Sequence, residues 1–93
     1  MNKLATEYLS QCKLNYINNV RPNIKNKYNI ESYKKIKDIA LKYFNEGKIE
    51  EFSDFFLEPQ YNTDLWTAHL ILDYANPNQI LKEKALEIIK KYS

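Results

Sequence analysis

The fold class is decided by the stretch NTDLWTAHLILDYANP, residues 62–77. It contains the only tryptophan and the only histidine of the 93-residue chain, Trp66 and His69. At helical spacing, one arc holds Leu65, Ala68, Ile71, Leu72 and Ala75, and a column beside it holds Trp66, Leu70 and Tyr74. A helix that is apolar around most of its circumference is normally packed between neighbours. The stretch therefore predicts a central helix with Trp66 in the core or at a subunit contact; a binding platform is the alternative.

Apolar side chains recur every three or four residues on both sides of this stretch, which predicts further helices. The expected helices cover about residues 3–20, 30–46, 49–57, 62–75 and 77–92. One glycine and three prolines argue against a β-sandwich or barrel, which needs many tight turns. We therefore expect an all-α fold of about five helices packed as antiparallel hairpins, in a single domain spanning residues 1–93.

Prolines, asparagines and the single glycine mark the expected helix ends. Pro22 disfavours a helical Arg21 and so ends the first helix. Gly47 is placed to adopt positive φ just past the second helix. Expected N-caps are Asn29 for the second helix, Asn62 or Thr63 for the fourth and Asn76 for the fifth, with Pro77 as its first helical residue and a Glu87–Lys91 pair near its end.

Residues 29–92 resemble a family of small bacterial HEAT-like domains of unknown function. Leu65-Trp66-Thr67-Ala68 matches a Leu-Trp-Ala-Ala element, Gly47 matches a glycine turn, and residues 85–89 match a closing helix. One departure is Asp64, where HEAT units often place an arginine. The resemblance implies a fragment of an α-α superhelix without known catalytic residues, of the kind found in toxin-immunity and partner-binding proteins.

The charged residues divide the chain into two halves of opposite sign. Residues 1–48 carry ten basic and four acidic residues, for a net +6, whereas residues 49–93 carry four and eight, for −4. Between Ile49 and Asp73 there are six acids and no base. A surface of one sign speeds the encounter with an oppositely charged partner. The predicted partner-binding residues are Glu50, Glu51, Asp54 and Glu58, with Tyr61 as an anchor. We expect a protein partner, first of all a basic toxin domain.

Two other functions stay open on the sequence. A lysine-rich face of the second helix predicts nucleic-acid binding, since phosphate contacts need positive charge. The residues in question are Lys25, Lys27, Lys34, Lys35, Lys37 and Lys42, with Tyr28 and Tyr33 between them. Against it, base recognition favours arginine, which occurs once in this chain. A structural homodimer that covers Trp66 or the tyrosines is the other alternative.

The sequence offers little for catalysis or for a cofactor. A single glycine excludes the glycine-rich phosphate-binding loops. One histidine and one cysteine, His69 and Cys12, cannot supply the usual three or four zinc ligands. We therefore expect no enzymatic activity, no cofactor and no metal. The sequence has no apolar run long enough for a signal peptide or a membrane span, which predicts a cytoplasmic protein without membrane contact.

Overall fold

A computed structural model describes residues 2–24 and 29–93 of the chain. These residues form the helices α1 (Lys3–Ile17), α2 (Glu31–Asn45), α3 (Ile49–Ser53), α4 (Thr63–Tyr74) and α5 (Gln79–Lys91), with the 3-10 turns η2 (Asp54–Leu57) and η3 (Gln60–Asn62). No strand occurs in these described ranges. The prediction of an all-α fold with about five helices is confirmed.

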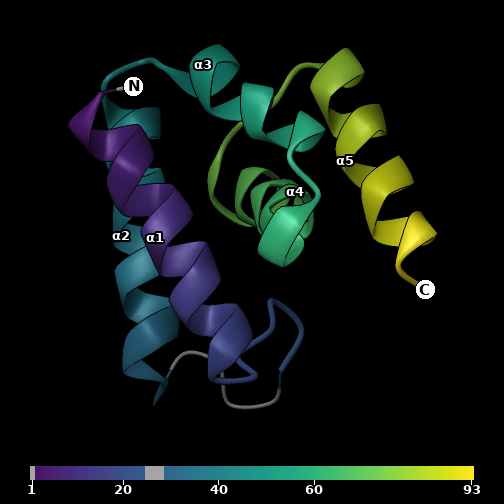
Figure 1. Ribbon diagram of the computed structural model, residues 1–93. Coiled ribbons are helices and arrows are strands. Elements are labelled where there is room, and N and C mark those ends of the chain that lie inside the picture. The colour runs from purple at the N-terminus through teal and green to yellow at the C-terminus, as the bar shows by residue number, and fades with distance from the viewer. Residues whose placement is uncertain (1, 25–28) are drawn as a thin grey trace.

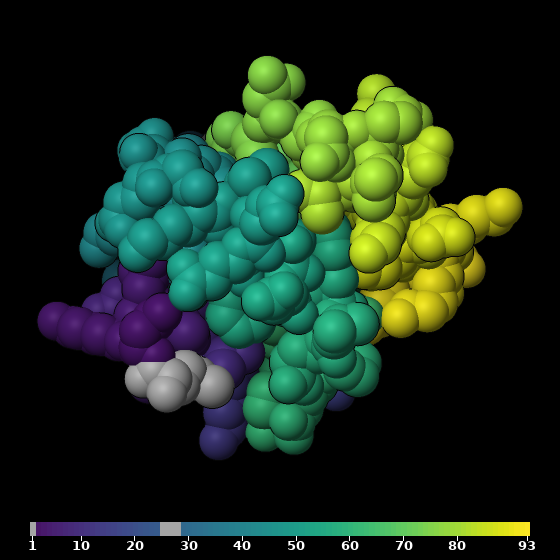
Figure 2. Space-filling view, turned by 90° about the horizontal axis from the view of Figure 1, so that it is seen from above, coloured from purple at the N-terminus to yellow at the C-terminus, as the bar shows by residue number. Residues whose placement is uncertain are grey.

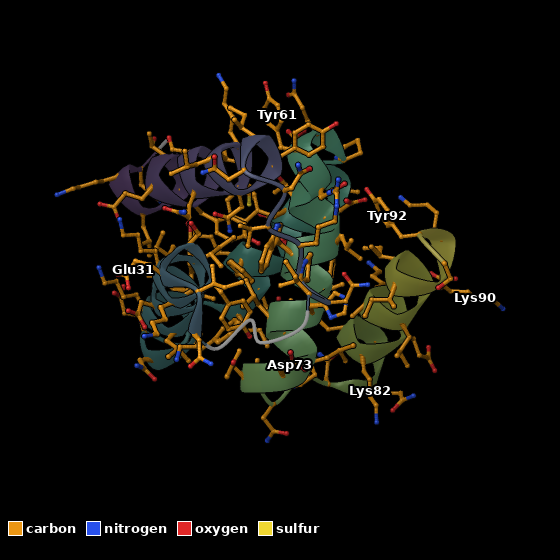
Figure 3. All side chains as sticks on the ribbon, turned by 90° about the horizontal axis from the view of Figure 1, so that it is seen from below. Glu31, Tyr61, Asp73, Lys82, Lys90 and Tyr92 are labelled. Carbon is orange, nitrogen blue, oxygen red and sulfur yellow. The ribbon has the colours of Figure 1, made fainter. Side chains whose placement is uncertain are left out.

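Helix α4 lies at the centre of the molecule. Figure 1 shows α1 and α2 side by side on one flank, α3 above them, α4 nearly end-on in the middle and α5 along the opposite flank. Figure 3 shows that α5 runs back along α4, since the Tyr61 and Asp73 ends of α4 lie opposite the Tyr92 and Lys82 ends of α5. Every other element thus supplies part of the cover that a helix apolar around most of its circumference requires.

The burial of α4 confirms that the part of residues 62–77 around Trp66 is core. Thr63, Asp64, Leu65, Trp66, Thr67, Ala68, Leu70 and Ile71 are all buried. Trp66 is only 1% exposed, and its ring lies 6.0 Å from that of Tyr33 on α2. The indole therefore packs inside its own chain, so the alternatives in which Trp66 is a binding platform or is covered by a second subunit are wrong.

An aromatic cluster joins α3 and η2 to the first two helices. The Tyr8 ring of α1 lies 4.8 Å from both Phe52 and Phe55, measured between ring centroids. Tyr43 of α2 lies 5.0 Å from Phe52, and Phe44 lies 5.2 Å from it. Tilted and edge-on pairs at these distances contribute about 1 kcal/mol each beyond the burial of their area. The cluster fixes the short α3–η2 segment on the core.

Helix α1 ends earlier than the sequence predicts. It stops at Ile17 rather than near Val20, because Asn19 takes the left-handed conformation (φ 59°). The Val20 amide donates to the Asn15 carbonyl at 2.8 Å and the Asn19 amide donates to Tyr16 at 3.2 Å. These two bonds form a Schellman C-cap, with asparagine in the position that glycine usually takes.

The buried face of α1 includes a polar residue. Asn15 is fully buried, whereas the neighbouring Tyr16 is 46% exposed. The Asn15 side chain accepts from Gln11 at 2.8 Å and donates to the Ser32 carbonyl of α2 at 3.5 Å. A buried polar group requires such partners. Asn15 therefore ties α1 to α2 through a polar contact.

Two of the predicted helix caps are wrong. Ile30, not Asn29, is the N-cap of α2, and it makes no side-chain capping bond. Helix α5 begins at Gln79, two residues after Pro77, and Asn78 rather than Asn76 accepts from the Leu81 amide at 2.9 Å. Asn62 does precede α4 but lies in the left-handed region and makes no side-chain cap. Several asparagines lie near these helix ends, and the course of the backbone decides which of them accepts the capping hydrogen bond.

We expect Gly47→Ala to lower the free energy of unfolding by about 1 kcal/mol. An alanine in the left-handed conformation is strained, and this cost is partly offset because alanine reduces the conformational entropy of the unfolded chain. Gly47 has φ 70°, and nothing lies within 4 Å of an added Cβ, so no clash contributes. The amides of Gly47 and Lys48 donate to Phe44 and Tyr43, a second Schellman motif. Urea denaturation measures the change. Gly47→Asn is the control and should cost less, since asparagine tolerates this conformation; equal losses would contradict the conformational origin.

Candidate functional site

The predicted acidic residues lie on one short surface segment. Helix α3 ends at Ser53 and continues as the 3-10 turn η2, so the predicted helix over residues 49–57 changes type midway. Glu50, Glu51 and Asp54 are exposed. Figure 2 shows this segment in the middle of one face, between the N-terminal residues and α5. The fully buried Phe52 anchors the segment from beneath, so the carboxylates project from a supported backbone.

Leu57, which the sequence analysis assigned no role, stands among these acids. It is 87% exposed, the highest value among the large apolar side chains of the described residues. In a 3-10 helix, residues three apart project in the same direction. Asp54 and Leu57 therefore point the same way from η2. The segment thus combines an apolar side chain with carboxylates around it.

Glu58 and Tyr61 lie together on a different part of this surface. Both line a small pocket of about 230 Å³ that Leu9 and Lys13 of α1 complete. Glu58 is half-buried and accepts from the Gln60 amide at 3.4 Å. Of the five predicted site residues, these two therefore share one pocket, next to α1 rather than in the middle of the acidic segment.

Tyr61 is held in an uncommon backbone conformation. Its φ of 57° and ψ of 29° place it in the left-handed region, which a bulky residue rarely adopts. Its ring lies 5.6 Å from that of Tyr16, and the Lys13 ammonium lies 5.8 Å from the ring centroid. The Tyr61 side chain is half-buried against α1. Tyr61 can therefore contribute the exposed part of its ring to a partner, but it does not stand free as an anchor.

In the folded protein, Glu51 lies next to lysines, although no lysine follows it in the sequence before Lys82. A depression of about 360 Å³ is lined by Glu51 together with Lys3, Lys42 and Lys48. Glu51 also accepts from the Asn2 side chain at 3.4 Å. The acidic surface therefore has a basic border at its α1–α2 side, and its negative charge is concentrated at Glu50, Asp54 and Glu58.

In the described part of the lysine-rich face of α2, the assigned tyrosine is not available for stacking on bases. Lys34, Lys35 and Lys42 are exposed, but Tyr33 is 1% exposed and its hydroxyl lies 2.8 Å from that of Tyr74. Asp38 is exposed among the lysines. The remaining residues assigned to this face, Lys25, Lys27 and Tyr28, lie outside the described residues. What the described part of the face offers to a nucleic acid is charge without stacking.

The most heavily bonded carboxylate in the described chain is one that the sequence analysis did not assign to any site. Asp64 is 1% exposed, and its oxygens accept from the Tyr92 hydroxyl at 2.7 Å, the Lys91 ammonium at 3.1 Å and the Leu65 amide at 2.8 Å. Lys91 thus pairs with Asp64 and not, as predicted, with Glu87. The contact with Asp64 contributes, after burial, to raising the pKa of Tyr92 to about 12. This cluster joins the end of α5 to the start of α4, so its role is structural.

The single cysteine is buried among hydroxyl groups. Cys12 is fully buried, and burial raises the pKa of its thiol to about 12 despite hydrogen bonds with Thr63 and Tyr8. Only the thiolate is a strong nucleophile or metal ligand. In residues 2–24 and 29–93, no three His, Cys, Asp or Glu side chains are grouped as a metal site would need. Cys12 is therefore a core residue that stays protonated at neutral pH.

Comparison with protein-family models, curated proteins and solved structures found no match. The resemblance to HEAT-like domains therefore stays a hypothesis, and any role has to be argued from the chain itself. Within the part of the chain that the structure describes, none of the helices has the length and apolar character to cross a membrane.

We expect Lys91→Met to destabilise the protein more than Asp64→Asn, by about 2 kcal/mol against about 1 kcal/mol or less. The Lys91 side chain is 60% exposed and Asp64 only 1%, so removing the lysine leaves a buried charge without its counterion. In Asp64→Asn, the side-chain oxygen of the asparagine still accepts from the Tyr92 hydroxyl and no charge is buried, while the Lys91 ammonium is solvated by water. Urea denaturation at pH 7 measures both, and the double variant should match Asp64→Asn. The reverse order would show that the pair contributes little.

A second prediction concerns alkaline pH. The pKa of Cys12 is raised from 9.0 to about 12, so above pH 9 the unfolded thiol loses its proton while the folded thiol keeps it. The stabilising contribution is therefore complete below pH 9 and is lost as pH rises toward 12, at up to about 1.4 kcal/mol per pH unit. In urea denaturation under reducing conditions, Cys12→Ala should flatten the decline between pH 9 and 11. Parallel curves for the variant and the parent chain would contradict it.

Proposed function

We propose that the protein is a non-catalytic interaction module that docks on a basic protein partner through its acidic surface. The acidic surface consists of Glu50, Glu51, Asp54 and Glu58 with Leu57 among them. The observation that carries the proposal is the 87% exposure of Leu57 on a segment with four acids and no base. Interfaces combine apolar anchors that fill pockets with a polar rim, and this segment has both parts.

The charge of the surface selects the class of partner. Carboxylates on one side of a protein raise the rate of association with a basic surface and disfavour acidic ones. The supported backbone of α3 and η2 adds preorganisation, because Phe52 and Phe55 hold it against Tyr8 and little ordering is needed on binding. The role we put first is that of an immunity protein, which would neutralise a cognate bacterial toxin by covering its basic surface. Tyr61, half-buried beside the acids, would contribute at the edge.

We also propose that this chain has no catalytic activity. The one cysteine is buried and protonated at neutral pH, as its raised pKa of about 12 requires. The most strongly bonded carboxylate, that of Asp64, has its oxygens occupied by Lys91, Tyr92 and the backbone. Neither group is available to a substrate. Inhibition by steric cover needs only a complementary surface, which is what the acidic segment offers.

The products of the genes adjacent to this coding sequence provide the test, by biolayer interferometry against the intact chain. Reversal of two exposed acids, Glu51→Lys with Asp54→Lys, should weaken binding by about 100-fold at low salt, mostly through slower association. The control is Glu83→Lys with Glu87→Lys on α5, where two exposed acids give the same change in net charge. The control should bind like the parent chain. Binding that survives the first reversal, or fails equally in the control, would refute the acidic surface as the contact.

Leu57→Ser tests the apolar anchor separately from the charge. Leu57 is 87% exposed, so its replacement should leave the free energy of unfolding nearly unchanged. Loss of its contact should weaken binding about 10-fold, mainly through faster dissociation. The same interferometry measures both rates. An unchanged dissociation rate would remove Leu57 from the interface.

A further inference from the structure

A second candidate site lies on another part of the molecule, where three separate segments meet. A pocket of about 400 Å³ is formed by the chain after α1, the start of α4 and the end of α5. We call it the Arg21 pocket; its walls include Arg21, Asn62, Leu65, His69, Ile89 and Tyr92. Figure 3 shows Tyr92 at the end of α5, on the side turned toward α4. The volume is within the range of small-molecule sites, about 300–1,000 Å³.

The pocket gathers the only arginine and the only histidine of the chain. Arg21 and His69 are far apart in the sequence, and the fold places both in the lining of this pocket. A guanidinium presents a rigid fork of N–H donors that matches a carboxylate or a phosphate. An imidazole has two nitrogens, so one can serve the protein while the other serves a ligand. These two groups together define a recognition site for an oxyanion.

The rest of the lining fits an apolar body behind such a head group. Leu65 is buried and Ile89 half-buried, and both line the pocket beside the Tyr92 ring. Asn62 lies in the left-handed conformation, and its side chain is not used to cap α4. Its amide is therefore a further candidate donor. Small-molecule sites commonly pair apolar walls with a few such polar groups.

The Asp64 carboxylate beside the pocket does not oppose an anion. Asp64 is 1% exposed, and Lys91 at 3.1 Å balances its charge. The pocket also lies at the start of α4, where the helix dipole is positive. The negative end of α5 is nearby, and Lys90 stands in its last turn. Among the described lining residues, Arg21 is the one whose side chain carries a permanent charge, and this charge attracts a negative ligand.

We propose that the Arg21 pocket binds a small organic anion, with a carboxylate or phosphate head group on Arg21 and His69 and an apolar body against Leu65 and Ile89. The site is distinct from the acidic surface of α3 and η2. Binding here neither requires nor excludes a protein partner there. The structure thus assigns the chain a ligand-binding capacity beside the proposed docking role.

An NMR titration of the ¹⁵N-labelled full chain with phenyl phosphate and with benzoate tests the proposal. At least one of the two should give saturable shifts at the Arg21 side chain and at amides of residues 62–69, with a dissociation constant in the millimolar range or below. Neutral benzamide should bind at least about 10-fold more weakly, because it lacks the charge that the guanidinium recognises. A preference between the two anions would identify the head group.

Matched variants separate a built site from general attraction to positive charge. Arg21→Gln should weaken anion binding about 10-fold or more, and Arg21→Lys by less, since it keeps the charge and loses the fork. Lys34→Gln removes an exposed positive charge outside the pocket and should have no effect. Because Arg21 is exposed, its variants should remain folded, which the amide spectrum verifies. The proposal is overturned if neither anion gives saturable shifts up to about 10 mM, if benzamide binds equally well, or if Lys34→Gln weakens binding as much as Arg21→Gln.

Discussion

Helix α4 must be covered around most of its circumference, and the arrangement of the other elements follows from this requirement. Its residues Thr63 to Ala68 are buried without a break, which leaves no face of this stretch for water. In a chain of 93 residues, each remaining helix has to supply part of the cover. The α1–α2 pair closes one flank, and η2 and α5 close the others (Figure 1).

The buried part of such a helix can keep polar atoms only if each one finds a hydrogen-bond partner inside the protein. Thr67 donates to the Thr63 carbonyl at 2.8 Å, so the Tyr8 hydroxyl must be the donor in the 2.9 Å bond that joins it to Thr67. Asp64 holds the end of α5 through Tyr92 and Lys91. These bonds fix how α1 and α5 are set along α4, which apolar contact alone leaves adjustable.

The same requirement determines what the surface can do. Because Trp66, Thr63, Thr67 and Asp64 are buried in α4, the acidic surface is formed by elements outside this helix. The α3–η2 segment is short and presents its acids with Leu57, while Phe52 faces inward. The Arg21 pocket forms at the seam where the covering elements end, because the ends of α4 and α5 meet the chain after α1 there. The two proposed sites are thus both products of how the outer elements close over the central helix.

The sequence determined the class of the fold and most of its core. Spacing alone identified the helices, the burial of Trp66, and the turn at Gly47, because helical periodicity and positive φ are local properties of the chain. It also identified the exposed acids Glu50, Glu51 and Asp54. Local rules were less certain at helix ends, where Asn19 ended α1 early and Asn78 replaced Asn76 as a cap.

Only the tertiary structure decided which distant groups meet. Lys91 pairs with Asp64 rather than with Glu87. Lysines lie beside Glu51, and Arg21 lines a pocket together with His69. Tyr61 turned out to be half-buried against α1, and Asn15 to be a buried link to α2. None of these contacts leaves a periodic trace in the sequence, because each depends on the relative placement of separate helices, and that placement is set by packing around α4.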